Sequence, residues 1–181
     1  MPEISFCEAC SVHKVGKCTR RVCPHLRFVD YESFTQLKTL PHCDLLYCNS
    51  GRLDFIELKA SDRFTTQEGA IPSVVDIFRD TQQYSCAFDS EKINQKFERS
   101  REEYLSMYPN CNKHTIRYIF LFSQFFVDYF KQKKNAEVDA NLLKLLLLQT
   151  IFAQYPANPS MHNGKSIPLI VDTCLQAECI F

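Results

Sequence analysis

Apolar residues along this chain recur with two spacings, one typical of strands and one typical of helices. Segments 43–48 and 53–60 are short and apolar, and the Asn, Ser, Gly and Arg between them favour a turn. These two segments therefore predict a β-hairpin. Segment 115–122 is β-branched and aromatic, and segment 167–174 is apolar, so each predicts a further strand.

Segments with helical spacing are interleaved with those strands. We expect a first helix over residues 31–40, with Asp30 as its N-cap, and a largely helical segment over residues 73–107. A third helix is expected over residues 135–155, with its cap near Asp139. The order helix, strand, strand, helix, strand, helix, strand predicts an α/β (α+β) fold, in which helices flank a mixed β-sheet.

Charged residues on the predicted hairpin give the sharpest chemical signal in the sequence. Side chains alternate between the two faces of a strand, so Glu57 and Lys59 share one face. If Cys48 pairs with Leu53 across the turn, Asp44 lies opposite Glu57 on the neighbouring strand. We therefore expect two carboxylates and one lysine at the same end of the hairpin.

Two carboxylates that lie close together repel each other unless a cation binds between them. We expect Asp44 and Glu57 to bind Mg²⁺ or Mn²⁺, which prefer oxygen ligands. Lys59 would lie beside the metal ion, where it could orient a water molecule or stabilise negative charge on a phosphate. The alternative is that Glu-x-Lys is only a pair of solvated charges on an edge strand.

Asp44 followed by Glu57-Leu58-Lys59 resembles the PD-(D/E)xK nuclease superfamily, in which an Asp on one strand precedes Glu-x-Lys or Asp-x-Lys on the next. The element order expected over residues 31–122 is similar to the αβββαβ core of that superfamily. One departure is that Cys43 precedes Asp44 where the superfamily often has proline.

The resemblance implies a metal-dependent nuclease (phosphodiester hydrolase) that acts on DNA or RNA. It implies that Glu32, on the first helix, assists the hairpin residues as a further catalytic acid. Some members add a glutamine from the helix after the Glu-x-Lys strand, and Gln82 or Gln83 could take that place. Many such enzymes are dimers, so a homodimer is a further expectation.

Four of the 10 cysteines lie in a polar segment near the N-terminus. They are Cys7, Cys10, Cys18 and Cys23. A CxxC pair followed by a second pair predicts a structural Zn²⁺ site, in which His13 or His25 could replace one thiolate. An iron–sulfur cluster, to which Cys174 and Cys179 could also contribute, is the less favoured metal centre. The alternative to any metal centre is that these cysteines are free or buried thiols. The remaining cysteines considered, Cys43, Cys48, Cys86 and Cys111, are expected in the core.

The formal net charge is 0, which argues against nucleic-acid binding over the whole surface. Residues 11–29, however, contain no Asp or Glu, and their basic residues could contact nucleic acid locally. The alternative is that they form a solvated face or balance the charge of a thiolate-bound metal. We expect residues 1–29 to form a zinc-knuckle-like segment ahead of a nuclease-like domain over residues 30–181.

The first residues lack the charged segment and apolar run of a signal peptide, and the longest apolar run, 142–153, is short for a bilayer. We therefore expect an intracellular (cytoplasmic) protein with no membrane partner. Two competing hypotheses stay open. One is a non-catalytic zinc-knuckle module that binds nucleic acid on a nuclease-like fold. The other is an interaction subunit that uses the Phe-rich segment 120–130.

Overall fold

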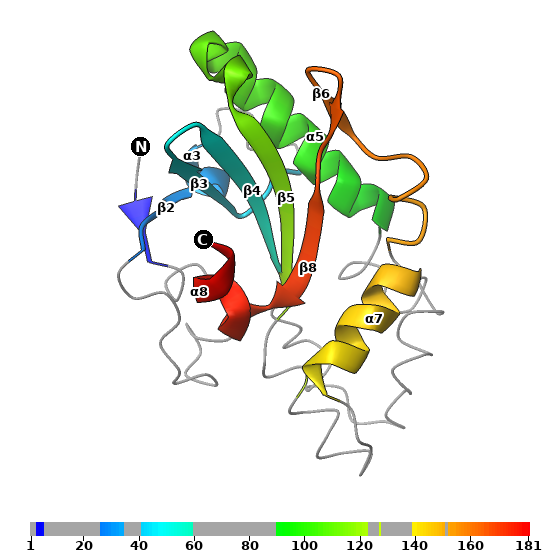
Figure 1. Cartoon of the computed structure of the whole chain (residues 1–181). Coiled ribbons are helices and arrows are strands. Elements are labelled where there is room, and N and C mark those ends of the chain that lie inside the picture. Colours follow the sequence, from blue (N-terminus) through cyan, green and yellow to red (C-terminus); the bar gives the residue numbers. More distant parts are fainter. Residues whose placement is uncertain are drawn as a thin grey trace.

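The described part of the chain forms a mixed β-sheet with helices packed on both of its faces (Figure 1). The computed structural model describes residues 3–5, 26–34, 41–59, 90–122, 127, 139–150 and 152–181. Within these residues the main sheet has six strands in the order β1-β2-β3-β4-β5-β8, and β6 pairs with β7 in a separate hairpin. The predicted mixed sheet with flanking helices is therefore confirmed.

The strands of the main sheet are β1 (Glu3–Ile4), β2 (Phe28–Asp30), β3 (Leu45–Asn49), β4 (Arg52–Lys59), β5 (Thr115–Phe122) and β8 (Leu169–Thr173). From β1 to β4 each neighbouring pair is antiparallel, whereas β4, β5 and β8 run parallel. Parallel strands need long crossover connections, and these contain the two longest described helices. The central strands β4 and β5 are covered on both faces, and most of their described side chains are buried, including the charged Asp54 and Glu57.

The helical elements are α3 (Tyr31–Phe34), α5 (Ser90–Met107), η2 (Pro109–Lys113), α7 (Ala140–Thr150), η3 (Cys174–Gln176) and α8 (Ala177–Ile180). The small hairpin consists of β6 (Met161–His162) and β7 (Lys165–Ser166). Among the described helices, none is both long enough and apolar enough to cross a membrane.

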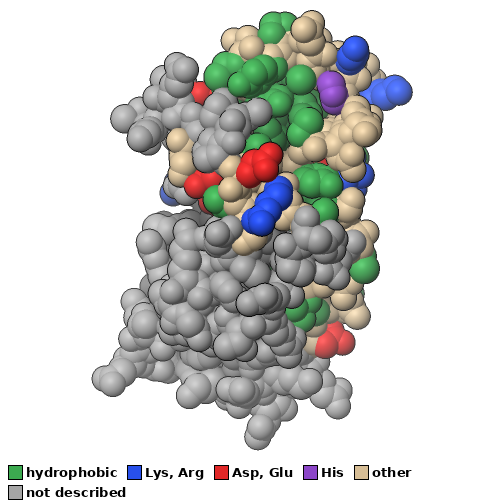
Figure 2. Space-filling view, turned by 90° about the vertical axis from the view of Figure 1, so that its left-hand side faces the viewer, with side chains coloured by type: hydrophobic (Ala, Val, Ile, Leu, Met, Phe, Trp, Pro, Cys, Tyr) green, Lys and Arg blue, Asp and Glu red, His purple; other side chains and the backbone are tan. Residues whose placement is uncertain are grey.

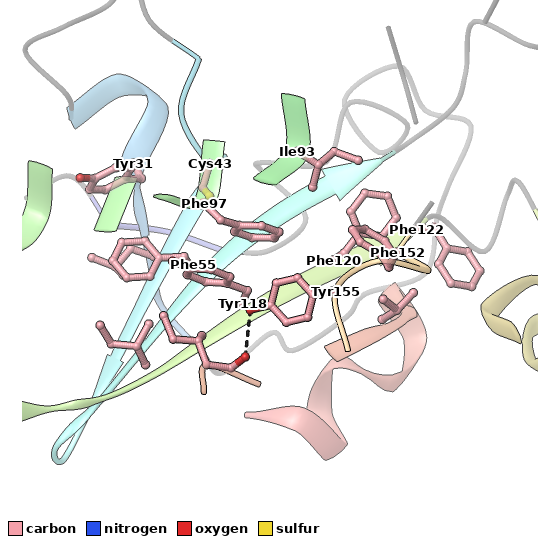
Figure 3. Close-up of a cluster of buried hydrophobic side chains, with 14 of the residues drawn as sticks. Tyr31, Cys43, Phe55, Ile93, Phe97, Tyr118, Phe120, Phe122, Phe152 and Tyr155 are labelled. Carbon is pink, nitrogen blue, oxygen red and sulfur yellow. Dashed lines mark hydrogen bonds between the residues drawn. The ribbon is translucent and has the colours of Figure 1, made fainter. Parts of the chain in front are cut away.

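A large aromatic cluster fills the space between the sheet and helices α5 and α7 (Figure 3). Helix α5 turns Ile93, Phe97 and Tyr104 inward at helical spacing, and all three are buried. Phe97 stacks on Tyr118 of β5, with ring centroids 4.7 Å apart and planes 5° apart. A smaller cluster, which includes Ile56, packs against the C-terminal helix on the opposite face of the sheet.

Both predicted helix caps are confirmed. The backbone N–H of Ser33 donates to Asp30 Oδ1 at 3.1 Å, and that of Leu142 donates to Asp139 Oδ1 at 2.8 Å. Helix α3 is described only as far as Phe34, and residues 35–40 of the predicted helix lie outside the described residues. The same holds for residues 73–89 of the next predicted helix, whose described portion, α5, ends at the predicted residue.

The predicted end of the third helix is wrong, because α7 ends at Thr150 and residues 152–158 form turns. Phe152 is buried against Phe120, with ring centroids 5.2 Å apart, and its N–H donates to the carbonyl of Leu147 at 3.1 Å. The Tyr155 hydroxyl donates to the carbonyl of Ile167 at 2.9 Å. These tertiary contacts favour a turn over one more helical turn.

The sequence patterns also miss four short strands. Strands β1, β2, β6 and β7 have only two or three residues each, too few for an alternating pattern to be recognised. The Phe-rich segment expected at a protein interface is core where the structure describes it, since Phe120, Phe122 and Val127 are all buried. The interaction-subunit hypothesis therefore loses the exposed aromatic side chains of Phe120 and Phe122.

Candidate active site at the end of the central hairpin

The hairpin β3–β4 has the register that the sequence predicts, with Cys48 paired to Leu53. The next residue beyond the paired part of β3 is Asp44, which immediately precedes that strand. Asp44 Oδ2 accepts a hydrogen bond from the backbone N–H of Leu58 at 2.6 Å. This hydrogen bond holds the Asp44 carboxylate against β4, at the residue that follows Glu57.

Glu57 is the buried acid of this site. Its side chain has 0% exposure, and both of its carboxylate oxygens contact Lys96 Nζ on α5, at 2.7 Å and 2.9 Å. A carboxylate without a partner at this depth would be strongly unfavourable. The Lys96 side chain is 22% exposed, so the ion pair lies at the edge of the core and solvent reaches it from one side.

The carboxylates of Glu57 and Asp44 both raise the pKa of Lys96. Burial alone would lower the pKa of Lys96, but the negative charges of Glu57 and Asp44 outweigh it, so the pKa is raised. Both carboxylates also act on the buried Cys43 thiol, whose pKa is raised by burial and then by Glu57 and Asp44. Cys43 is therefore a neutral thiol, and the charged groups here are two carboxylates and one ammonium.

The segment before Asp44 is anchored on both sides. The backbone N–H of Cys43 donates to the Ser100 hydroxyl of α5 at 2.9 Å, and Tyr31 N–H donates to the carbonyl of Asp44 at 3.1 Å. The Tyr31 hydroxyl in turn donates to the Ser100 carbonyl at 2.9 Å. Proline has no N–H and could not make the bond to Ser100 from position 43.

The structure places Asp44 close to Glu57, but it does not describe the side chains of the other predicted site residues. Lys59 is the last residue of β4, paired in register with Phe122, and Glu32 lies within α3. The side chains of both residues are outside what the structure describes. The same is true of the whole of Gln82 and Gln83.

Lys96 is a site residue that sequence reasoning missed. It lies one position before Phe97, on the border of the inward row of α5. In the sequence, Lys96 is only a lysine beside the apolar stripe of an amphipathic helix, and such a lysine is usually solvated. Only the packing of α5 against β4 shows that its partner is a buried glutamate.

The described part of the site offers few possible metal ligands. Among the described residues, no group of three or more His, Cys, Asp or Glu side chains could hold a metal ion. Asp44 and Glu57 supply carboxylate oxygens from two residues. Mg²⁺ commonly binds through one or two carboxylates and completes its coordination with water and substrate phosphate.

The predicted zinc ligands lie outside the described residues, as do His13 and His25. Among the described residues, Cys43, Cys48, Cys111, Cys174 and Cys179 take part in no disulfide. The prediction of a core position is wrong for Cys48, which is exposed because it lies close to the turn of the β3–β4 hairpin. Cys174 is buried and Cys179 is exposed.

The described surface carries mixed charge. Figure 2 shows a face on which acidic and basic side chains are interspersed, in keeping with the formal net charge of 0. Most of the basic stretch 11–29 lies outside the described residues.

No family model matches the chain, and neither does any curated protein or solved structure.

Proposed function

We propose that this protein is a metal-dependent nuclease that hydrolyses phosphodiester bonds in DNA or RNA, with Asp44 and Glu57 as ligands of Mg²⁺ or Mn²⁺. The observation that carries the proposal is the convergence of these two acids at one end of hairpin β3–β4, where Lys96 neutralises the buried Glu57. Even when it is paired with Lys96, the buried Glu57 carboxylate contributes little to stability, and the second acid beside it favours a role in cation binding.

The element order supports the same class of protein. Strands β2, β3 and β4 form an antiparallel meander, and α5 then leads to the parallel strand β5. This βββαβ run is similar to part of the αβββαβ core of the PD-(D/E)xK superfamily, which the motif around Asp44 and Glu57 resembles. It differs in that α3 follows the first strand of the meander instead of preceding it.

Each residue of the candidate site would have a separate role in hydrolysis. Asp44, held by Leu58 N–H, and Glu57 provide the oxygen ligands and the negative charge that attract the cation. A divalent ion bound there would supply a Lewis acid and an activated water molecule. Lys59 would orient that water or stabilise charge on the phosphate, with Glu32 assisting. We also propose that the cysteines at positions 7, 10, 18 and 23 hold a structural Zn²⁺ and that this basic segment contacts the substrate.

The test is a cleavage assay of the full chain on labelled single- and double-stranded DNA and RNA, with Mg²⁺, Mn²⁺ or EDTA. We expect Glu57→Gln and Lys59→Ala to lower the metal-dependent rate by more than the ~10–100-fold that outer-shell partners of a metal are worth. Asp172→Asn is the matched control, because Asp172 pairs with Lys144 at 2.6 Å on β8, two strands away from β4.

The control variant should retain the wild-type cleavage rate, and circular dichroism should show all variants folded. Equal cleavage by wild type and Glu57→Gln, or no cleavage of any substrate by wild type, would contradict the proposal. Binding of nucleic acid that persists without any cleavage would instead support the non-catalytic binding module.

A further inference from the structure

Lys96 occupies the position at Glu57 that a cation would take. Its Nζ contacts both carboxylate oxygens of Glu57, at 2.7 Å and 2.9 Å, which is the bridging position that a two-oxygen cation ligand offers. Lys96 extends from α5, and Glu57 lies on β4, so the pair ties the crossover helix to the metal-binding strand. An ammonium and a divalent ion cannot share this position without strong repulsion.

We infer that Lys96 is a built-in counter-cation of Glu57, which holds the carboxylate in place until a divalent ion arrives and then yields it. This inference rests on the proposed cation site at Asp44 and Glu57. It adds that cation binding is coupled to movement of the Lys96 ammonium away from Glu57. Lys96 is thus a positioning residue and, at the same time, a competitor of the metal ion.

The net charge of Asp44, Glu57 and Lys96 is consistent with replacement of the Lys96 ammonium by a divalent ion at Glu57. Asp44, Glu57 and Lys96 together carry one net negative charge, so in the absence of metal the buried acid is paired and the fold is stable. Addition of a divalent ion changes the net charge of the three groups to one positive. That positive charge matches a single phosphodiester group, and the released ammonium is available to a phosphate oxygen.

The wild-type protein allows a direct test of the release. Amine acetylation of the full chain, followed by mass spectrometry, compares the labelling rate of Lys96 with and without Ca²⁺ or Mn²⁺, in the absence of nucleic acid. We expect labelling of Lys96 to rise several-fold with the cation. Lys144, which pairs with Asp172 on β8, two strands away from β4, serves as an internal control and should be labelled at an unchanged rate. An unchanged rate at Lys96 would overturn the inference.

A pair of variants tests the competition. Lys96→Met removes the ammonium but keeps the length of the side chain, and it should lower the unfolding midpoint in EDTA by about 5–10 °C because Glu57 loses its ion pair with Lys96. Mn²⁺ should restore most of this loss. Mn²⁺ affinity should rise at least about tenfold, since the repulsion between the ammonium and the ion is gone.

Two further variants serve as comparisons. Lys144→Met removes a more exposed pair and should shift the midpoint by less than about 2 °C, with no recovery in Mn²⁺. Lys96→Arg retains a cation at Glu57 and should stay folded in EDTA. Mn²⁺ affinity of Lys96→Met equal to or below that of wild type would overturn the inference. These readouts need no cleavage, so they separate a failure of the lysine exchange from a failure of the proposed nuclease activity.

Discussion

Ser100→Ala tests how helix α5 positions the segment that carries Asp44. Ser100 is fully buried on α5, and its hydroxyl accepts the backbone N–H of Cys43 at 2.9 Å. Alanine fills nearly the same volume but leaves that buried N–H without an acceptor. An unsatisfied buried donor costs about 1–3 kcal/mol, so we expect a loss of that size in the free energy of unfolding.

The same change should weaken the site without touching either carboxylate. Asp44 directly follows Cys43, and its position depends on the hydrogen bond that Ser100→Ala removes. We expect a loss of metal-dependent cleavage of about 10-fold or more, as for supporting partners of a metal site.

Urea unfolding of wild type and Ser100→Ala measures the stability, and the labelled-substrate assay measures the rate. Ser33→Ala is the control, because it removes an exposed hydroxyl that donates to Asp30 at 2.7 Å. A loss of stability below about 0.5 kcal/mol for Ser100→Ala, which is typical of a neutral surface change, would refute this account of how Asp44 is anchored.

Three other predictions test the fold around the site. Asp54→Asn should cost about 3 kcal/mol in urea unfolding, since buried Asp54 accepts two bonds from Arg117 at 2.7 Å; a change near zero would contradict this. Gly51→Ala should cost about 1 kcal/mol, because Gly51 has φ +81° in the hairpin turn; an unchanged midpoint would contradict it. In alkylation at pH 8 read by mass spectrometry, buried Cys43 should resist, whereas Cys48 should react, although slowly, because partial desolvation of its sulfur raises the pKa of Cys48. Rapid labelling of Cys43 would contradict its burial.

The hairpin was predictable because its information is local. The turn residues 49–52 limit how the two strands can pair, and the alternation of apolar and charged residues fixes the face of each side chain. The pairing of Cys48 with Leu53, and hence the position of Asp44 near Glu57, follows from these two constraints. The caps at Asp30 and Asp139 were predictable for the same reason, since each bonds within its own first helical turn.

Features set by tertiary packing were not predictable from the sequence. Lys96 meets Glu57 only because α5 packs across β4, and nothing in the local sequence distinguishes it from a solvated lysine. Ser100 acquires its role in the same way, through contact with Cys43 far away in the sequence. The early end of α7 likewise depends on burial of Phe152 against Phe120, which outweighs the continuing helical pattern.

The central claim is that Asp44 and Glu57 bind one divalent ion between them, and a titration with Mn²⁺ tests it most directly. Electron paramagnetic resonance of the free ion would follow binding to wild type, Asp44→Asn, Glu57→Gln and the control Asp172→Asn. We predict that Asp44→Asn and Glu57→Gln each lose the bound ion, whereas wild type and Asp172→Asn retain it. Undiminished binding by either site variant would contradict the claim.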